Sequence, residues 1–212
     1  MTEPGSHEFS TSASRLAYDG AVIALRVDDV VMPGGRSAVR EVIEHYGAVA
    51  IVAIDDEDRI AFVEQYRHPL GARLLELPAG LLDEPGESPL RAAERELVEE
   101  AGIAADSWKL LVDVAVSPGM TDEVVRVFLA QDLRETARPE AEHEEADMRI
   151  LRVPLADAVK MALRGEISNA TSVAGVLALH AARAAGTDLR EPDAPWPLRP
   201  SALARRRHGD GE

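Results

Sequence analysis

The stretch that decides the fold runs from Gly80 to Ile103 and reads GLLDEPGESPLRAAERELVEEAGI. A loop rich in glycine and acidic residues leads directly into a sequence with helical features. Ser88 is a favourable N-cap residue, Pro89 suits the first helical position, and Gly102 is typical of the residue just past a helix end. These signals predict a helix that begins at Pro89 and ends before Gly102.

The predicted helix carries three glutamates on one side. With about 100° of rotation per residue, Glu96, Glu99 and Glu100 share an arc of roughly 100°. The neighbouring arc carries the apolar residues that we expect to face a core, which are Leu90, Ala93, Leu97 and Ala101. Crowded carboxylates repel one another, and a hard divalent cation with oxygen ligands is the usual compensation. A solvated charged face is the simpler interpretation for an anonymous helix, but the ordered loop, cap, arginine and glycine favour a metal site.

The order of these residues resembles the Nudix box, whose usual form is G-x5-E-x7-R-E-U-x-E-E-x-G-U, where U is an aliphatic residue. The matching positions are Gly80, Glu87, Arg95, Glu96, Leu97, Glu99, Glu100, Gly102 and Ile103. One departure is present, because six residues rather than five separate Gly80 from Glu87. The extra residue lies around Asp83 to Gly86, where a loop tolerates an insertion. It therefore affects the path of the loop and not the helix ligands.

Length and composition limit the remaining possibilities. The 212 residues fit one domain with an appendage or two small domains, and a hydrophobic content of 46% is enough for a core. The net charge of −15 disfavours nonspecific binding to nucleic acid or to an anionic membrane. The absence of cysteine excludes disulfides, thiolate metal sites and cysteine catalysis. Without a secretory signal or an apolar stretch long enough to span a bilayer, a soluble cytoplasmic protein is expected.

The pattern along the chain predicts four segments. Residues 1–14 are expected to be disordered, 15–46 to form a hairpin that turns at Pro33-Gly34-Gly35, 47–188 to form the main domain, and 189–212 to form a tail. The tail carries four prolines and is expected to be extended or mobile, with Arg205, Arg206 and Arg207 solvated.

The main domain is expected to begin with a hairpin of 48–54 and 60–66. Further strands are predicted at 74–77, 108–116, 124–130 and 149–153, and helices after the box at 154–163 and 169–185. Strands mixed with helices on both faces indicate a three-layer α/β/α sandwich.

Four features outside the box resemble the ADP-ribose pyrophosphatase branch of the Nudix family, especially bacterial, mycobacterial-type enzymes. The N-terminal hairpin with its MPGG turn resembles an extra antiparallel sheet that helps to build a homodimer. QYRHPLGARLLELPAG at 65–80 resembles a segment that places an arginine and a glutamate, here Arg67 and Glu76, at the substrate. Pro118, beside Gly119, follows Ile103 by fifteen residues, and a proline near this offset marks ADP-ribose preference. EAEHEEADM at 140–148 resembles an acidic loop that closes on the substrate and supplies the base.

Each of these features has a structural alternative. Arg67 fits a surface cation, and Glu76 fits a cap for the following turn. Pro118 and Gly119 fit an ordinary turn, and the acidic loop fits a solvated run of charge. The occurrence of all four in the family's order favours the functional interpretation.

The resemblance implies a Nudix fold, an α/β/α sandwich with a mixed sheet, plus an N-terminal antiparallel sheet used in dimerisation. It implies Mg²⁺-dependent hydrolysis of ADP-ribose to AMP and ribose 5-phosphate, with Mn²⁺ as an alternative and about two or three ions per site. The expected metal ligands are Glu96, Glu100, Glu99 and the backbone carbonyl of Ala79. The expected catalytic residues are Glu145 as general base, Glu144 as its alternative, Glu99 on a metal-bound water, and Arg95 paired with Glu87 or a helix carboxylate.

Other functions stay open at this point. Another Nudix specificity would direct the same chemistry to nucleotide sugars or oxidised nucleoside diphosphates. A non-catalytic ADP-ribose sensor usually loses box glutamates and gains a DNA-binding segment, whereas this chain keeps the glutamates and is strongly acidic. A metal-buffering or interaction protein is supported only by the acidity.

Overall fold

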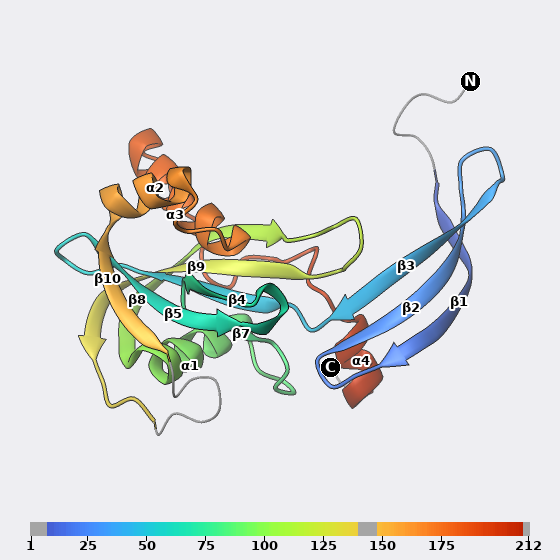
Figure 1. Ribbon diagram of the computed structural model, residues 1–212, viewed down its shortest axis with the longest axis horizontal. Helices are drawn as coiled ribbons and strands as arrows, with labels where there is room; N and C mark the ends of the chain where they lie inside the picture. The colour runs from blue at the N-terminus through green and yellow to red at the C-terminus, as the bar shows by residue number, and fades with distance from the viewer. Residues whose placement is uncertain (1–7, 140–147, 210–212) are drawn as a thin grey trace. The chain divides into compact units, whose positions relative to one another are not determined.

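The strand Ala48–Ala53 (β4) is buried along its whole length, and the larger part of the fold is built around it. In the computed structural model, which describes residues 8–139 and 148–209, β4 lies inside a four-stranded sheet of order β7-β4-β9-β8 (Figure 1). Its other strands are Ala79–Leu81 (β7), Val124–Glu135 (β9) and Ile103–Ala115 (β8). The sheet is mixed, because β4 runs parallel to β9 and antiparallel to β7.

Side chains alternate along a strand, so β4 contributes to two separate cores. Val52 packs in the core that includes Leu155–Arg164 (α2) and Ala170–Ala185 (α3). Ile51 packs in the opposite core, which includes Pro89–Ala101 (α1). Figure 1 shows α1 on one side of the strands and α2 and α3 on the other. The α/β/α sandwich with a mixed sheet is therefore confirmed.

A second, antiparallel sheet has the order β10-β5-β6. It consists of Arg149–Pro154 (β10), Arg59–Arg67 (β5) and Ala72–Glu76 (β6), with a short 3-10 helix, His68–Leu70 (η1), between the last two. The predicted hairpin of 48–54 with 60–66 is wrong: only Ile54 and Ile60 form an isolated bridge. The physical reason is that β7 and β9 occupy both hydrogen-bonding edges of β4, so β5 pairs elsewhere.

A third sheet has the order β1-β2-β3 and is antiparallel. Its strands are Ser10–Asp19 (β1), Ile23–Val31 (β2) and Ser37–His45 (β3), and the predicted turn contains Gly34 and Gly35 at φ 86° and 82°. The expected disorder through residue 14 is wrong from Ser10 onward. The sequence of β1, STSASRLAYD, lacks the alternating apolar pattern that marks a strand, and all of its residues are exposed. Backbone pairing with β2 holds the strand in place.

The tail is also more ordered than expected. Ala202–His208 forms a helix (α4), and Leu203 is buried against Ala24 and Tyr46. The prolines all precede Ser201, so they do not prevent a helix after it, and seven residues are too few to show a clear 3.6-residue period. Among the residues that the structure describes, no helix is long and apolar enough to cross a membrane.

The described chain divides into two compact units. Unit 1 takes its described residues from Met1–Gly47, Ser117–Glu123 and Pro200–Glu212, and unit 2 from Ala48–Val116 and Val124–Arg199. The loop Ser117–Glu123 and the α4 segment therefore belong with the N-terminal sheet, an association that the predicted segment boundaries did not include.

Candidate active site

Helix α1 forms as its sequence predicts. The Ser88 hydroxyl accepts a hydrogen bond from the Arg91 backbone N–H at 3.3 Å, and Pro89 occupies the first turn. Gly102 adopts a left-handed conformation at φ 63°, which a glycine allows without strain. Ala93 and Leu97 are buried, so the glutamates of the helix lie on the faces beside the core contact.

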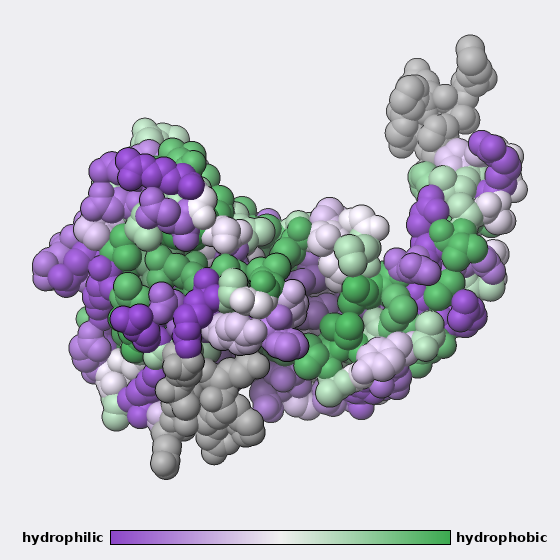
Figure 2. Space-filling model, viewed as in Figure 1, coloured by the Kyte–Doolittle hydropathy of each residue, from purple (hydrophilic) through white to green (hydrophobic). Residues whose placement is uncertain are grey.

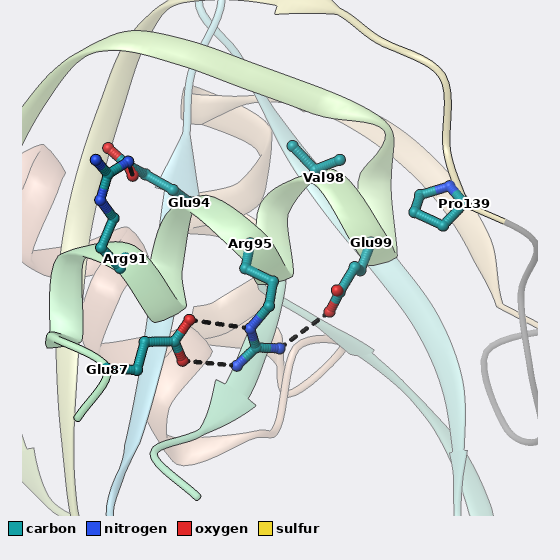
Figure 3. Close-up of a pocket in the computed structure, with 7 residues that line it drawn as sticks. All are labelled: Glu87, Arg91, Glu94, Arg95, Val98, Glu99 and Pro139. Atoms are coloured by element: carbon teal, nitrogen blue, oxygen red, sulfur yellow. Dashed lines mark hydrogen bonds and ion pairs between the residues drawn. The ribbon is translucent and has the colours of Figure 1, made fainter. Parts of the chain in front are cut away.

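Arg95 lies at the centre of the carboxylate cluster (Figure 3). Its Nε and Nη2 donate to Glu87 at 3.2 and 3.0 Å, and its Nη1 donates to Glu96 at 2.6 Å and to Glu99 at 3.0 Å. The predicted pairing of Arg95 is confirmed: it pairs with Glu87 and with the helix carboxylates of Glu96 and Glu99. These hydrogen bonds raise the pKa of Arg95, and the one with Glu87 contributes most. One guanidinium faces three carboxylates, which leaves an excess of negative charge.

Glu96 carries the electrostatic cost of that excess. Glu96 is only 9% exposed. Burial raises the pKa of its carboxyl to about 7, although Arg95 opposes the rise. A Cβ atom at Gly80 would come within 2.0 Å of the Glu96 carboxyl group. The first glycine of the box is thus required because β7 passes directly over this carboxylate.

Glu100 is held against the same strand. It is 5% exposed, and its Oε2 accepts a hydrogen bond from the Ala79 N–H at 2.9 Å. Two contacts, Ala79 with Glu100 and Gly80 with Glu96, therefore bring β7 and α1 together. The predicted ligand set of Glu96, Glu99, Glu100 and Ala79 comes from these two neighbouring elements.

The donor set fits a hard divalent cation. Carboxylate and backbone carbonyl oxygens are the ligands that such ions prefer, and two of the carboxylates, Glu96 and Glu100, are nearly fully buried. Within residues 8–139 and 148–209, no three histidine or acidic side chains are arranged so that they could hold a metal ion. The guanidinium of Arg95 occupies the space between Glu87, Glu96 and Glu99 instead.

An open depression of about 460 Å³ lies along the solvent side of α1 (Figure 3). Its lining residues are Glu87, Arg91, Glu94, Arg95, Val98, Glu99 and Pro139. No functional role was predicted for Arg91, Glu94 or Val98. Five of the lining residues follow the i, i+3, i+4, i+7, i+8 spacing of one helical face from Arg91 to Glu99, and this signal could have found them.

The end of α1 is fixed by a segment that sequence reasoning missed. Arg138 Nε donates to the Glu99 carbonyl at 2.8 Å, and the Thr136 N–H donates to the Gly102 carbonyl at 2.8 Å. Pro139 then lines the depression beside Glu99. An arginine at a helix C-terminus satisfies a free carbonyl and complements the helix dipole.

Arg67 and Glu76, predicted to contact the substrate, lie on neighbouring strands and pair with each other. Arg67 Nη2 donates to Glu76 Oε2 at 2.6 Å, and Gln65 Nε2 donates to the same oxygen at 3.3 Å. Glu76 is 2% exposed. Only Leu77 and Pro78 separate Glu76 from Ala79. The Arg67–Glu76 pair therefore lies just before β7, the strand that contacts α1.

Pro118 and Gly119 lie in the loop Ser117–Glu123 between β8 and β9, which packs with unit 1. The structure therefore groups them with β3 rather than with α1. Glu144 and Glu145, the predicted bases, lie outside the described residues.

Comparisons with known proteins agree with this geometry. The NUDIX domain family matches residues 44–174. An ADP-ribose pyrophosphatase of Mycobacterium tuberculosis is 54% identical over 95% of this chain and 97% of its own length. One from Bacillus subtilis is 39% identical over 78% of this chain and 89% of its own. A solved structure, described as an ADP compounds hydrolase, superposes with a TM-score of 0.74 and 23% identity over 88% of this chain and 100% of its own, which supports the fold.

Proposed function

This chain belongs to the Nudix family of hydrolases, and from that premise we propose that it hydrolyses the pyrophosphate of ADP-ribose to AMP and ribose 5-phosphate. Two relatives that carry the name ADP-ribose pyrophosphatase, at 54% and 39% identity, support the substrate. The observation that carries the chemistry is the cluster around Arg95 of α1, where Glu87 from the preceding loop and Glu96 and Glu99 from the helix share one guanidinium.

Nudix hydrolases generally use divalent metals. For this chain we propose Mg²⁺, with Mn²⁺ as the alternative and about two or three ions per site, held by Glu96, Glu99, Glu100 and the Ala79 carbonyl. The raised pKa of the buried Glu96 supports this set, since a carboxyl that lacks enough nearby positive charge is a good partner for a cation. When bound, the metal supplies the positive charge that allows a nucleophile to approach a pyrophosphate.

The remaining roles belong to the protein's own side chains. Arg95 orients the carboxylates through its four hydrogen bonds to Glu87, Glu96 and Glu99. Glu145 is proposed as the general base, with Glu144 as the alternative, because the helix glutamates are committed to the metal. Substrate contacts are proposed for Arg67, Glu76, Pro118 and Gly119.

We also propose a homodimer formed through the N-terminal sheet. Leu16, Tyr18 and Val39 are 43%, 58% and 60% exposed on its strands, and apolar residues are visible over it in Figure 2. Exposed apolar residues on a sheet are typical of an interface with another chain. Light scattering tests this proposal, and a monomer at working concentration would refute it. Localisation in the cytoplasm stays a prediction from the sequence.

The decisive experiment is turnover of ADP-ribose with Mg²⁺, followed by chromatography of the products. AMP and ribose 5-phosphate in equal amounts are expected. Faster turnover of nucleotide sugars or oxidised nucleoside diphosphates in the same substrate panel would favour another Nudix specificity. Tight binding of ADP-ribose with no product, in the presence of Mg²⁺ or Mn²⁺, would instead indicate a sensor.

A further inference from the structure

Helix α4 is joined to the end of β3 by a buried carboxylate. Glu44 is 2% exposed, and Arg206 donates to both of its oxygens, with Nε at 3.0 Å and Nη2 at 2.9 Å. These residues are 162 positions apart in the chain. Bidentate pairing of an arginine with a carboxylate fixes both distance and orientation, so the contact sets where α4 lies against β3.

Two further contacts hold α4 across the same end of the sheet. Arg207 pairs with Asp19 at 2.6 Å and also donates to the Gly20 carbonyl, at the end of β1. The rings of His208 and Tyr46 stack with centroids 6.4 Å apart, just after β3. Together with the buried Leu203, these contacts attach the helix to β1 and β3 at once.

The residues on either side of Glu44 hold the loop Ser117–Glu123. The Ile43 N–H donates to the Met120 carbonyl at 2.8 Å, and the Asp122 N–H donates to the Ile43 carbonyl at 3.1 Å. The His45 N–H donates to Asp122 Oδ1 at 2.8 Å. The loop is therefore attached to the two residues of β3 that flank Glu44, whose side chain is held by α4.

We propose that α4 is a positioning element for the loop Ser117–Glu123, and that Arg206 acts through Glu44 to set how well this loop binds substrate. The proposal rests on the proposed function, in which Pro118 and Gly119 contact ADP-ribose. The NUDIX family match ends at residue 174, so α4 lies outside the part of the chain that matches the shared domain. In this proposal α4 contributes to substrate affinity and not to the hydrolytic step.

Glu44 keeps a partner when Arg206 is removed. Arg26 Nη1 donates to Glu44 Oε1 at 2.9 Å, so Glu44 retains a cationic partner in Arg206→Ala and we expect the sheet to stay folded. Arg205 offers a matched control, because it lies on the same helix, carries the same charge and is exposed. Arg206→Lys keeps the charge but loses the bidentate geometry, so its effect on the loop should be intermediate between those of Arg206→Ala and Arg205→Ala.

The test compares Arg206→Ala with Arg205→Ala in the full chain, by amide hydrogen exchange of residues 40–46 and 117–123 and by steady-state kinetics on ADP-ribose. We expect exchange in 117–123 to become about fivefold faster in Arg206→Ala only. We expect its KM to rise about fivefold while kcat stays within about twofold, a size typical of mutations that act through neighbouring contacts.

Unchanged exchange in 117–123 of Arg206→Ala would overturn the proposal. Faster exchange with an unchanged KM would overturn its functional half, because the loop would then not bind substrate. If Arg206→Ala does not fold, Arg206→Lys decides on the same two measurements. Should the unaltered protein fail to hydrolyse ADP-ribose, the proposed function fails, while the exchange comparison still decides whether α4 holds the loop.

Discussion

Two partly buried charge clusters in this protein differ in their balance of positive and negative charge. On α1, one arginine, Arg95, faces three carboxylates. In unit 1, Arg26 and Arg206 face the two carboxylates of Asp28 and Glu44. Among the ion-paired side chains, the first cluster has one cation for three carboxylates and the second, balanced cluster has two cations for two carboxylates.

The pKa values follow this difference. Burial raises the pKa of Glu96 to about 7, and Arg95 compensates only in part. Burial would also raise the pKa of Asp28, but hydrogen bonds from Arg26 and Ser14 outweigh it and hold that pKa below its usual value. A balanced cluster stabilises the fold by itself, whereas an unbalanced one is suited to a ligand that brings positive charge.

Removing the charge of a proposed metal ligand beside the unbalanced cluster should have the largest effect. Glu100→Gln is expected to lower kcat by about a hundredfold or more, because a metal ligand loses its charge. The glutamine oxygen can still accept the Ala79 N–H, so the fold should survive. Steady-state kinetics and circular dichroism measure the two effects. Normal turnover in this variant would contradict the metal assignment.

A side chain added at Gly80, next to Glu96, should have the second-largest effect. Gly80→Ala would place a methyl group within 2.0 Å of the Glu96 carboxyl, which must then move. Metal affinity should fall about tenfold to a hundredfold while the helical content is retained. Calorimetric titration with Mg²⁺ or Mn²⁺ gives the affinity. An unchanged affinity would show that the position of Glu96 does not matter for the metal.

The pH dependence of stability separates the two clusters directly. Because the folded pKa of Glu96 is raised, its contribution to stability is fully present below pH 4.5 and is lost as the pH rises through about 7. In a chelating buffer, the unaltered protein should lose on the order of 2–3 kcal/mol relative to Glu96→Gln between pH 5 and pH 8. Urea unfolding measures this difference, and saturating Mg²⁺ should abolish it. A difference that stays constant with pH would argue against the unbalanced cluster.

The balanced cluster should give the smallest effect and the opposite sign. Asp28→Asn should cost about 1–2 kcal/mol of unfolding free energy at pH 7. The pKa of Asp28 is lowered, so this cost should shrink as the pH falls below its usual value of 3.8. Metal affinity should not change. Asp29→Asn, an exposed neighbour on the same strand, is the control. A loss of metal binding in Asp28→Asn would remove the distinction between the clusters.

The helix α1 was predictable because its determinants are local. Ser88, Pro89 and Gly102 act within one or two turns, and a fixed rotation per residue places Glu96, Glu99 and Glu100 on one side. The same reasoning missed β1, whose residues are all exposed, and placed β4 and β5 in one hairpin. Strand partners depend on which edges remain free, and the sequence of a strand does not record that.

The amino-acid sequence by itself therefore determined the box helix, its cap, its core face and its acidic face, since a helix is specified by residues three and four positions apart. The tertiary structure alone decided that Arg95 joins Glu87 to both helix carboxylates and that Arg138 holds the Glu99 carbonyl. It also decided that Arg206 reaches Glu44 across 162 residues. Contacts of this kind depend on how distant segments pack, and no local periodicity encodes them.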